Sequence, residues 1–184
     1  MERNTDLVVL LDEDEQPVGT APRTEVHHAR TPLHLAFSCY LFDHTGRVLL
    51  TRRALAKRTW PGVWTNSFCG HPRPGESLEV ALHRYAAHEL GTTVRDVSCV
   101  LPTFRYRAVD ASGVVENEVC PVFTATCEDP DQLLPNPDEV AEWQWVTVAG
   151  LGAAAAAAPW ALSPWLLEQH EQLRRLDDWS AGER

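Results

Sequence analysis

The sequence predicts a single α+β domain in which mixed β-sheets pack against helices. Two patterns support this prediction: apolar runs of strand length recur between turn signals, and two longer segments carry helix signals, one internal and one near the C-terminus. A chain of 184 residues has the size of one compact domain. We therefore expect one domain over residues 1–184, with a core of about 5–168 and a C-terminal helix over about 163–179.

The predicted strands are apolar segments bounded by turn residues. They cover residues 7–11, 34–42, 48–52, 63–69, 97–107, 114–126 and 142–148. The sequence Asp43-His44-Thr45-Gly46 between the second and third strands is typical of a hairpin.

The internal helix is predicted from Ser77 to Leu90. Ser77 suits the N-cap, and Gly91 suits the position that follows the last helical turn. The terminal helix begins at Ser163-Pro164, with Pro164 in the first helical position. The alanine-rich run Ala153–Ala158 fits a low-complexity helix or a loop.

Composition limits the possible partners. The net charge is −10 and the pI is near 5.2, which argues against a general nucleic-acid or anionic-membrane surface. An anionic substrate would therefore need a local basic cluster. We also expect neither a signal peptide nor a membrane span, because no segment approaches ~20 apolar residues.

The five cysteines form an odd set without a C-x-x-C pair, which suits a reducing cytoplasm in which the thiols stay free. Four of them are expected to be small buried hydrophobic residues. These four are Cys39, Cys99, Cys120 and Cys127.

The loop before the internal helix resembles the Nudix box, G-x5-E-x7-R-E-U-x-E-E-x-G-U, in which U is a bulky apolar residue. Gly70, Glu76, Arg84, Glu89 and Gly91 are in register with it. The R-E-U-x-E-E part reads R-Y-A-A-H-E here, so two of the box's carboxylates are replaced. The resemblance therefore implies the loop–helix scaffold but argues against nucleoside-diphosphate hydrolysis.

Two pairs of reactive side chains have the spacing of a strand. Cys69 and His71 share a face if this segment is extended, and so do Glu116 and Glu118. The carboxylates could form a solvated edge, but buried carboxylates need a cation or hydrogen-bond partners. These two carboxylates and the imidazoles of His27, His34 and His71 form a potential metal site. Such a set suits Mn²⁺, Zn²⁺ or Fe²⁺ rather than Mg²⁺ alone.

Long blocks across the chain resemble the type 1 isopentenyl-diphosphate isomerases. They are T-N-S-F-C-G-H-P-R-P-G-E, T-R-R-A-L-A-K-R-T-W-P-G-V-W, F-R-Y-R-A, V-E-N-E-V-C-P-V and P-W-A-L-S-P-W. The likeness extends from about Leu7 to Trp165. It implies an enzyme of isoprenoid biosynthesis that interconverts isopentenyl and dimethylallyl diphosphate by proton addition and removal through a tertiary carbocation.

The resemblance also implies a role for each matching residue. Proton transfer is expected from Cys69, Glu118 and Tyr106. The first metal, Mn²⁺ or Zn²⁺, would be bound by His27, His34, His71, Glu116 and Glu118. Mg²⁺ bound with the diphosphate would be held by Glu89 and the carbonyl of Cys69. The remaining substrate contacts would come from Arg53, Lys57, Arg23 and Trp165.

Two details complete these expectations. Where the family has a basic pair, Arg84 is followed here by Tyr85, so a structural role for Arg84 is the alternative. We expect a cytoplasmic monomer that binds a small isoprenyl diphosphate and no nucleic acid. The rival hypotheses are a nucleoside-diphosphate hydrolase and a non-catalytic module that binds metal or phosphate.

Overall fold

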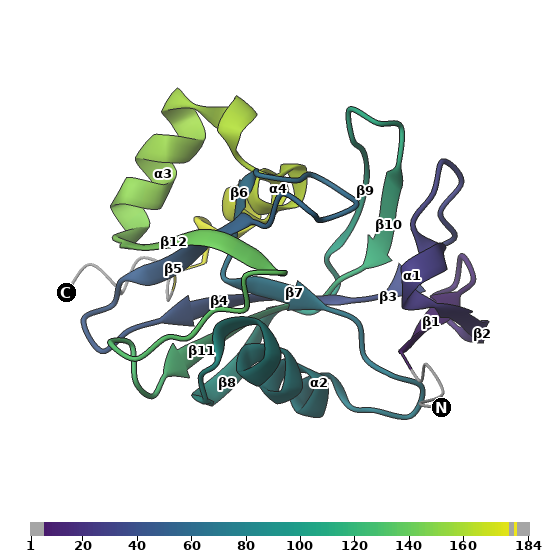
Figure 1. Cartoon of the computed structure of the whole chain (residues 1–184), viewed down its shortest axis with the longest axis horizontal. Helices are drawn as coiled ribbons and strands as arrows, with labels where there is room; N and C mark the ends of the chain where they lie inside the picture. The colour runs from purple at the N-terminus through teal and green to yellow at the C-terminus, as the bar shows by residue number, and fades with distance from the viewer. Residues whose placement is uncertain (1–5, 177–178, 180–184) are drawn as a thin grey trace.

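The computed structural model describes residues 6–176 and Trp179, and it contains two mixed sheets with helices on both sides of the larger one (Figure 1). The expected domain limits at residues 1–5 and 180–184 lie outside the described residues. The strands are β1 (Leu7–Leu11), β2 (Pro17–Pro22), β3 (His34–Leu35), β4 (Phe37–Phe42), β5 (Val48–Arg53), β6 (Trp64–Thr65), β7 (Phe68–Gly70), β8 (Val94–Leu101), β9 (Arg105–Val109), β10 (Val115–Val119), β11 (Val122–Cys127) and β12 (Val140–Val146). The helices are α1 (Arg23–Val26), α2 (Leu78–Tyr85), the π-helix η1 (Ala86–Leu90), α3 (Val148–Ala157), the 3₁₀-helix η2 (Pro159–Ala161) and α4 (Pro164–Leu173).

The smaller sheet has the order β2-β1-β3-β10-β9. The larger has the order β12-β5-β4-β11-β8, with β6 paired to β5 and β7 to β4. Two pairs are parallel, β10 with β3 and β11 with β4, and all other pairs are antiparallel. The predicted α+β class with mixed sheets is therefore confirmed.

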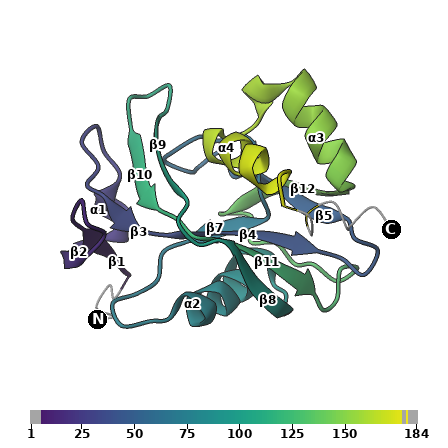
Figure 2. The ribbon, with the colours of Figure 1, turned by 180° about the vertical axis from the view of Figure 1, so that it is seen from behind.

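Strand β4 shows why the larger sheet is covered on both faces. Its alternate side chains Phe37, Cys39 and Leu41 pack in the cluster that contains α2. Tyr40, between them, packs in the cluster that contains α3 and α4. Figures 1 and 2 accordingly show α2 on one side of the sheet and α3 and α4 on the other. No helix in the described part of the chain has the length and apolar content to cross a membrane.

Three predicted strands are each divided between the two sheets. The expected strand 34–42 is β3 and β4, 97–107 lies within β8 and β9, and 114–126 is β10 and β11. Pro102 and Pro121 lie at two of these transitions, where a residue without an N–H cannot continue the ladder. These transitions join the sheets into one unit.

The expected strand 63–69 is also interrupted, because it forms β6 and β7 around Asn66-Ser67. Both of these side chains are buried and hydrogen-bonded: Asn66 Nδ2 donates to Phe68 O over 2.9 Å, and Ser67 Oγ donates to Leu49 O over 2.7 Å. Local side-chain bonds thus replace the ladder at this point.

The predicted helix starts are confirmed. The hydroxyls of Ser77 and Ser163 accept hydrogen bonds from the backbone N–H groups of Val80 and Leu166. The internal helix changes into η1 after Tyr85 and ends before Gly91, whose φ is 62°. The alanine-rich run lies mostly in α3, so the helical alternative is correct.

The terminal helix is shorter than the predicted range 163–179. It ends at Leu173, and residues 177–178 lie outside the described part. Trp179 is buried, and its ring packs edge-on against Tyr40 and Phe42, with centroids 5.1 Å and 5.6 Å away.

We predict that Gly70→Ala destabilises the fold by about 1–3 kcal/mol, the usual cost of overpacking. A Cβ at this position would lie 2.5 Å from Cδ2 of the buried Tyr85 ring. Urea denaturation measures the loss in the free energy of unfolding. Gly19→Ala is the control, because nothing lies within 4 Å of its added Cβ. Equal stability of the two variants would contradict this packing argument.

Candidate active site

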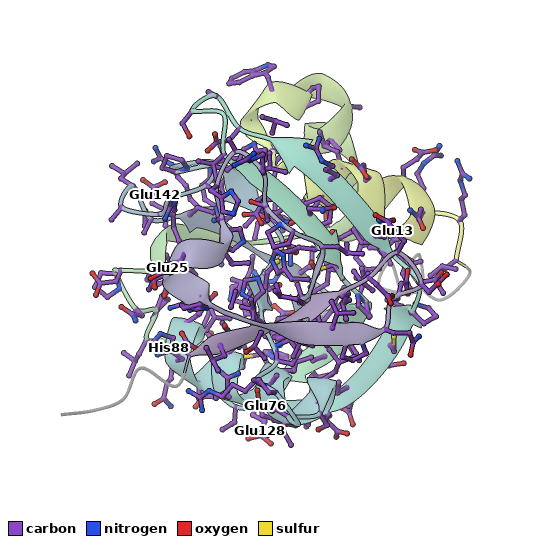
Figure 3. The ribbon with its side chains drawn as sticks, turned by 90° about the vertical axis from the view of Figure 1, so that its right-hand side faces the viewer. Glu13, Glu25, Glu76, His88, Glu128 and Glu142 are labelled. Atoms are coloured by element: carbon purple, nitrogen blue, oxygen red, sulfur yellow. The ribbon has the colours of Figure 1, made fainter. Side chains whose placement is uncertain are left out.

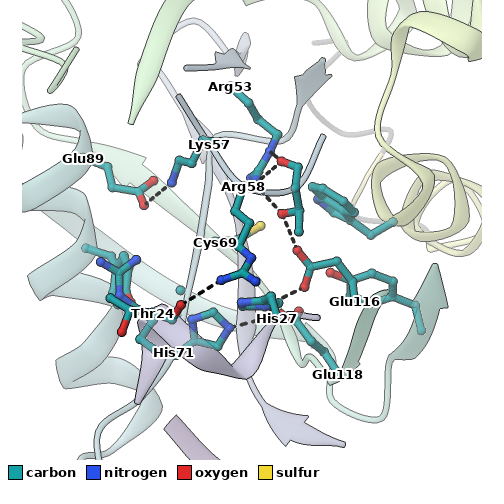
Figure 4. A pocket seen from close by; sticks show the side chains of 16 residues that line it. Thr24, His27, Arg53, Lys57, Arg58, Cys69, His71, Glu89, Glu116 and Glu118 are labelled. Carbon is teal, nitrogen blue, oxygen red and sulfur yellow. Dashed lines mark hydrogen bonds and ion pairs between the residues drawn. The ribbon is translucent and has the colours of Figure 1, made fainter. Parts of the chain in front are cut away.

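The predicted site residues surround a cavity of about 320 Å³ between the two sheets (Figure 4). Its walls come from α1, the β5–β6 loop, β7, η1, β9, β10 and α4. All predicted site residues except His34 line it: Arg23, His27, Arg53, Lys57, Cys69, His71, Glu89, Tyr106, Glu116, Glu118 and Trp165. His34 is fully buried beside them.

Four of the predicted metal ligands form a compact group. Potential ligand atoms of His27, His34, His71 and Glu118 all lie within 4.8 Å of one another. Glu118 Oε1 is their common neighbour, and its distances to the Nε2 atoms of His71, His34 and His27 are 3.2, 3.4 and 4.0 Å. Glu116 lies outside this group but adjoins it, with Oε2 2.9 Å from His27 Nε2.

The donor atoms of this group fit a divalent cation. His27 Nε2, His34 Nε2 and Glu116 Oε2 are buried and make no hydrogen bond among the described residues. His34 Nδ1 lies 2.9 Å from the carbonyl oxygen of Pro32, which can only accept, so Nδ1 carries a proton and Nε2 is the nitrogen left to bind a cation. A second partner that fixes the tautomer in this way is usual for histidine ligands. Imidazole and carboxylate donors are the appropriate types for Mn²⁺ or Zn²⁺.

The histidines also determine the charge of Glu118. Burial raises the pKa of this carboxyl, but its close contacts with His27, His34 and His71 outweigh burial and hold it well below the ordinary value. For His27 the effects are reversed: burial lowers its pKa, but its contacts with Glu116 and Glu118 outweigh burial and raise the pKa to about 9. Glu118 is therefore an ionised carboxylate at neutral pH.

Cys69 differs from Glu118 in its protonation. Burial raises the pKa of its thiol to about 11, although hydrogen bonds from Ser38 and Asn66 act in the opposite direction. Sγ lies 3.3 Å from both Ser38 Oγ and Asn66 Nδ2. At neutral pH the thiol therefore carries its proton while facing the same cavity as the Glu118 carboxylate.

Two aromatic residues complete this end of the cavity. Tyr106 is the register partner of Glu118 on β9, and its ring centroid lies 5.7 Å from that of Trp165. Burial, followed by the charge of Glu118, raises the pKa of Tyr106 well above its ordinary value, so the hydroxyl keeps its proton. Trp165 is 2% exposed, and its Nε1 donates to Asn66 Oδ1 over 3.1 Å.

Two basic side chains, Lys57 and Arg53, form what we call the basic end of the cavity. Lys57 is paired with Glu139 and lies 3.8 Å from Glu89 Oε1. Arg53 Cζ stands 5.3 Å from the Trp165 ring centroid. Burial raises the pKa of Glu89 to about 7, against the attraction of Lys57. These residues combine positive charge with a carboxylate, as a site for a diphosphate and Mg²⁺ would require.

Two predicted phosphate contacts are engaged elsewhere in the structure. Arg23 lines the cavity but pairs with Asp6. Arg84 does not line it; its guanidinium makes two bonds to Glu76, of 2.8 and 2.6 Å, and donates to His71 O over 3.2 Å. The structural alternative for Arg84 is therefore favoured.

Several residues of the site were not predicted from the sequence. Asn66 and Ser38 contact the Cys69 thiol, and Thr59 contacts Glu116. Asn66 and Thr59 lie inside the two sequence blocks around Cys69 and Arg53 that resemble the isomerases. Their position in these blocks could have indicated that they belong to the site.

The prediction that four cysteines are buried is wrong for Cys99. This residue is exposed on β8, whereas Cys39, Cys120 and Cys127 are buried. Buried and exposed side chains do not alternate regularly along β8, and Ser98 and Cys99 are both exposed. The strand pattern therefore does not predict burial of Cys99. His88 is exposed and lies at the periphery with several labelled glutamates in Figure 3.

Comparisons with known proteins identify the fold. The NUDIX domain model matches residues 32–166. Among solved structures, DR0079 from Deinococcus radiodurans is similar with a TM-score of 0.67 and 21% identity, covering 90% of this chain and 98% of that one. A MutT protein from Methanosarcina mazei Go1 has a TM-score of 0.57 at 18% identity, covering 79% and 97%. These two structures support the fold alone.

Curated relatives are much more similar in sequence. The isopentenyl-diphosphate Delta-isomerase of Leifsonia xyli subsp. xyli is 62% identical over 164 residues, 88% of each chain. Its counterpart in Frankia alni is 61% identical over 165 residues, 89% of this chain and 84% of the relative. The counterpart in Clavibacter sepedonicus is 59% identical over 169 residues, 92% of this chain and 88% of the relative. The chain therefore belongs to the NUDIX family and, within it, to the isopentenyl-diphosphate Delta-isomerases.

Proposed function

We propose that this chain interconverts isopentenyl diphosphate and dimethylallyl diphosphate in isoprenoid biosynthesis, with Cys69 and Glu118 as the proton-transfer groups. The observation that carries the proposal is that the Cys69 thiol and the Glu118 carboxyl line one cavity, where burial raises the pKa of the thiol and the imidazoles hold the pKa of the carboxyl low. Moving a double bond requires one proton to be added to a carbon and one to be removed from another. A pair with one proton between its members supplies one donor and one acceptor at the start of each turnover.

Tyr106 and Trp165 support the charged intermediate. Proton addition to the substrate gives a tertiary carbocation, which aromatic faces attract by about 0.5–2 kcal/mol. Both rings border the cavity, and both are nearly inaccessible to solvent. Their burial also keeps water away from the cation, which it would otherwise capture. Tyr106 is opposite Glu118 in the β9–β10 ladder, and its hydroxyl keeps its proton and would assist Glu118.

His27, His34, His71, Glu116 and Glu118 would hold a divalent cation, Mn²⁺ or Zn²⁺, which would supply a fixed positive charge beside the Glu118 carboxylate. Glu89 and the Cys69 carbonyl would hold Mg²⁺ together with the diphosphate. Lys57, which lies 3.8 Å from Glu89, and Arg53 line the same cavity and would contact phosphate oxygens. Arg23 is a further candidate for this role. We retain a cytoplasmic monomer as a prediction.

Two rival functions make different predictions. Hydrolysis of a nucleoside diphosphate is disfavoured, because Tyr85 and His88 replace two carboxylates of the Nudix box. Phosphate release from a panel of nucleotides would reveal it. A non-catalytic binding module would take up metal or diphosphate without exchanging solvent deuterium into the five-carbon skeleton of the substrate.

Cys69→Ala and Glu118→Gln should each lower turnover by at least about 10²–10⁴-fold, the usual contribution of a general acid or base. Each change removes a proton-transfer group. The assay follows isopentenyl diphosphate conversion, with circular dichroism to verify folding. Cys99→Ala is the matched control, because this thiol is exposed and does not line the cavity. Near-normal turnover by either site variant would rule out the assigned pair.

Removal of metal should abolish turnover and lower the melting temperature, because the buried donor atoms of the histidine–glutamate group lose their cation. Re-addition of Mn²⁺ at about 100 times its dissociation constant should restore about 2.7 kcal/mol of stability. Calorimetric melting after chelation, with and without Mn²⁺, measures this change. In the control variant His71→Asn, Mn²⁺ should change the melting temperature much less than in the wild type. If the chelated wild type keeps both its activity and its melting temperature, the metal centre is refuted.

Lys57→Gln should raise KM for isopentenyl diphosphate about 10-fold or more with a smaller change in kcat, since a lost hydrogen bond between charged groups costs about 1.5–3 kcal/mol. Steady-state kinetics separates the two constants. Arg52→Gln is the control: this neighbouring cation does not line the cavity and instead bonds to Gly62 O and Glu142. Equal KM values for both variants would exclude Lys57 from the diphosphate site.

A further inference from the structure

Thr59 connects the metal group with the basic end of the cavity. It lies in the loop between β5 and β6, lines the cavity and is 4% exposed. Its Oγ1 is 2.6 Å from Glu116 Oε1 and 3.0 Å from Arg53 Nη2. Its carbonyl oxygen accepts two further bonds from Arg53, of 3.0 Å from Nε and 2.9 Å from Nη2.

The chemistry of the three groups fixes the direction of each hydrogen bond. A guanidinium only donates, a carboxylate only accepts, and a hydroxyl has one proton to give. Arg53 therefore donates to Thr59 Oγ1, and the single proton of Thr59 goes to Glu116 Oε1. Because the guanidinium of Arg53 can only donate, both hydrogen bonds point the same way: Arg53 donates to Thr59, and Thr59 donates to Glu116 beside the metal group.

This hydrogen bond distinguishes the two oxygens of Glu116. Oε1 is occupied by Thr59, whereas Oε2 lies 2.9 Å from His27 Nε2 and is buried without a hydrogen bond. We propose that Thr59 is a positioning residue of the metal centre, whose hydroxyl orients Glu116 so that Oε2 faces the cation. The inference rests on the proposed role of the histidine–glutamate group as a metal site and adds a residue that contacts no metal itself.

The hydroxyl is the part of Thr59 that matters for Glu116. Valine has nearly the same shape but cannot donate, so Thr59→Val would free the carboxylate and leave Oε1 without its partner. The backbone carbonyl of residue 59 would still accept both bonds from Arg53. Outer-sphere partners of this kind typically contribute 10–100-fold to metal affinity.

The test is calorimetric titration of the metal-free full chain with Mn²⁺ in the absence of substrate. Thr59→Val should weaken Mn²⁺ binding about tenfold or more, and Thr59→Ser, which keeps the donor, should restore an affinity close to that of the wild type. Thr51→Val is the matched control. Its buried hydroxyl donates to Asn66 O over 2.9 Å and does not line the cavity, so the Mn²⁺ affinity should not change.

The outcomes separate this inference from the proposed function. His71→Asn identifies the binding event that belongs to the histidine–glutamate group. Wild-type binding that depends on His71, together with unchanged or tighter binding by Thr59→Val, overturns the role of Thr59 and leaves the metal centre intact. If the wild-type protein shows no Mn²⁺ binding that depends on His71, both the metal centre and the role of Thr59 are overturned. Thr59→Ala, for which the same loss is expected, replaces the valine variant if circular dichroism shows that the latter is unfolded.

Discussion

The buried carboxylate of Glu118 is the constraint on which the rest of the site depends. It is 5% exposed, and an uncompensated charge in such a position costs several kcal/mol. Three imidazoles surround one of its oxygens at 3.2–4.0 Å. Nε2 of His27 lies 2.9 Å from Glu116 Oε2 and Nε2 of His34 lies 3.4 Å from Glu118 Oε1, although neither nitrogen makes a hydrogen bond of ordinary geometry. The imidazoles compensate the buried charge, and the same convergence of donor atoms is what the proposed metal site requires.

The backbone registers explain how one residue obtains so many specific neighbours. Glu118 on β10 is opposite His34 on β3 in a parallel pair and opposite Tyr106 on β9 in an antiparallel pair. In the larger sheet, Cys69 on β7 is opposite Ser38 on β4. Because β3 and β4 are separated only by Ala36, the two registers are linked. Hydrogen-bonded ladders thus fix the thiol and the carboxylate relative to each other with little freedom for either.

Local patterns predicted those features of the chain that depend on near neighbours. The two-residue spacing of Glu116 with Glu118 and of Cys69 with His71 places each pair in the cavity, and the caps at Ser77 and Ser163 follow from short-range rules. The transfer of strands between sheets was not predicted, since periodicity does not say which sheet receives a strand. Thr59 and Asn66 were missed for a related reason: their partners Glu116 and Trp165 lie 57 and 99 residues further along the chain.

The departure from the Nudix box shows how the fold accommodates different chemistry. Glu76 and Arg84 are retained, and Arg84 also donates to His71 O, so these two residues brace the loop that presents the thiol and an imidazole. Tyr85 replaces a carboxylate and fills the space against Gly70, directly after Cys69. The helix thereby loses acidic groups and gains packing behind the reactive strand. In the proposed mechanism, Cys69 on β7 and Glu118 on β10 take the place of a helix-borne carboxylate cluster, since a fold fixes the framework while its side chains determine the reaction.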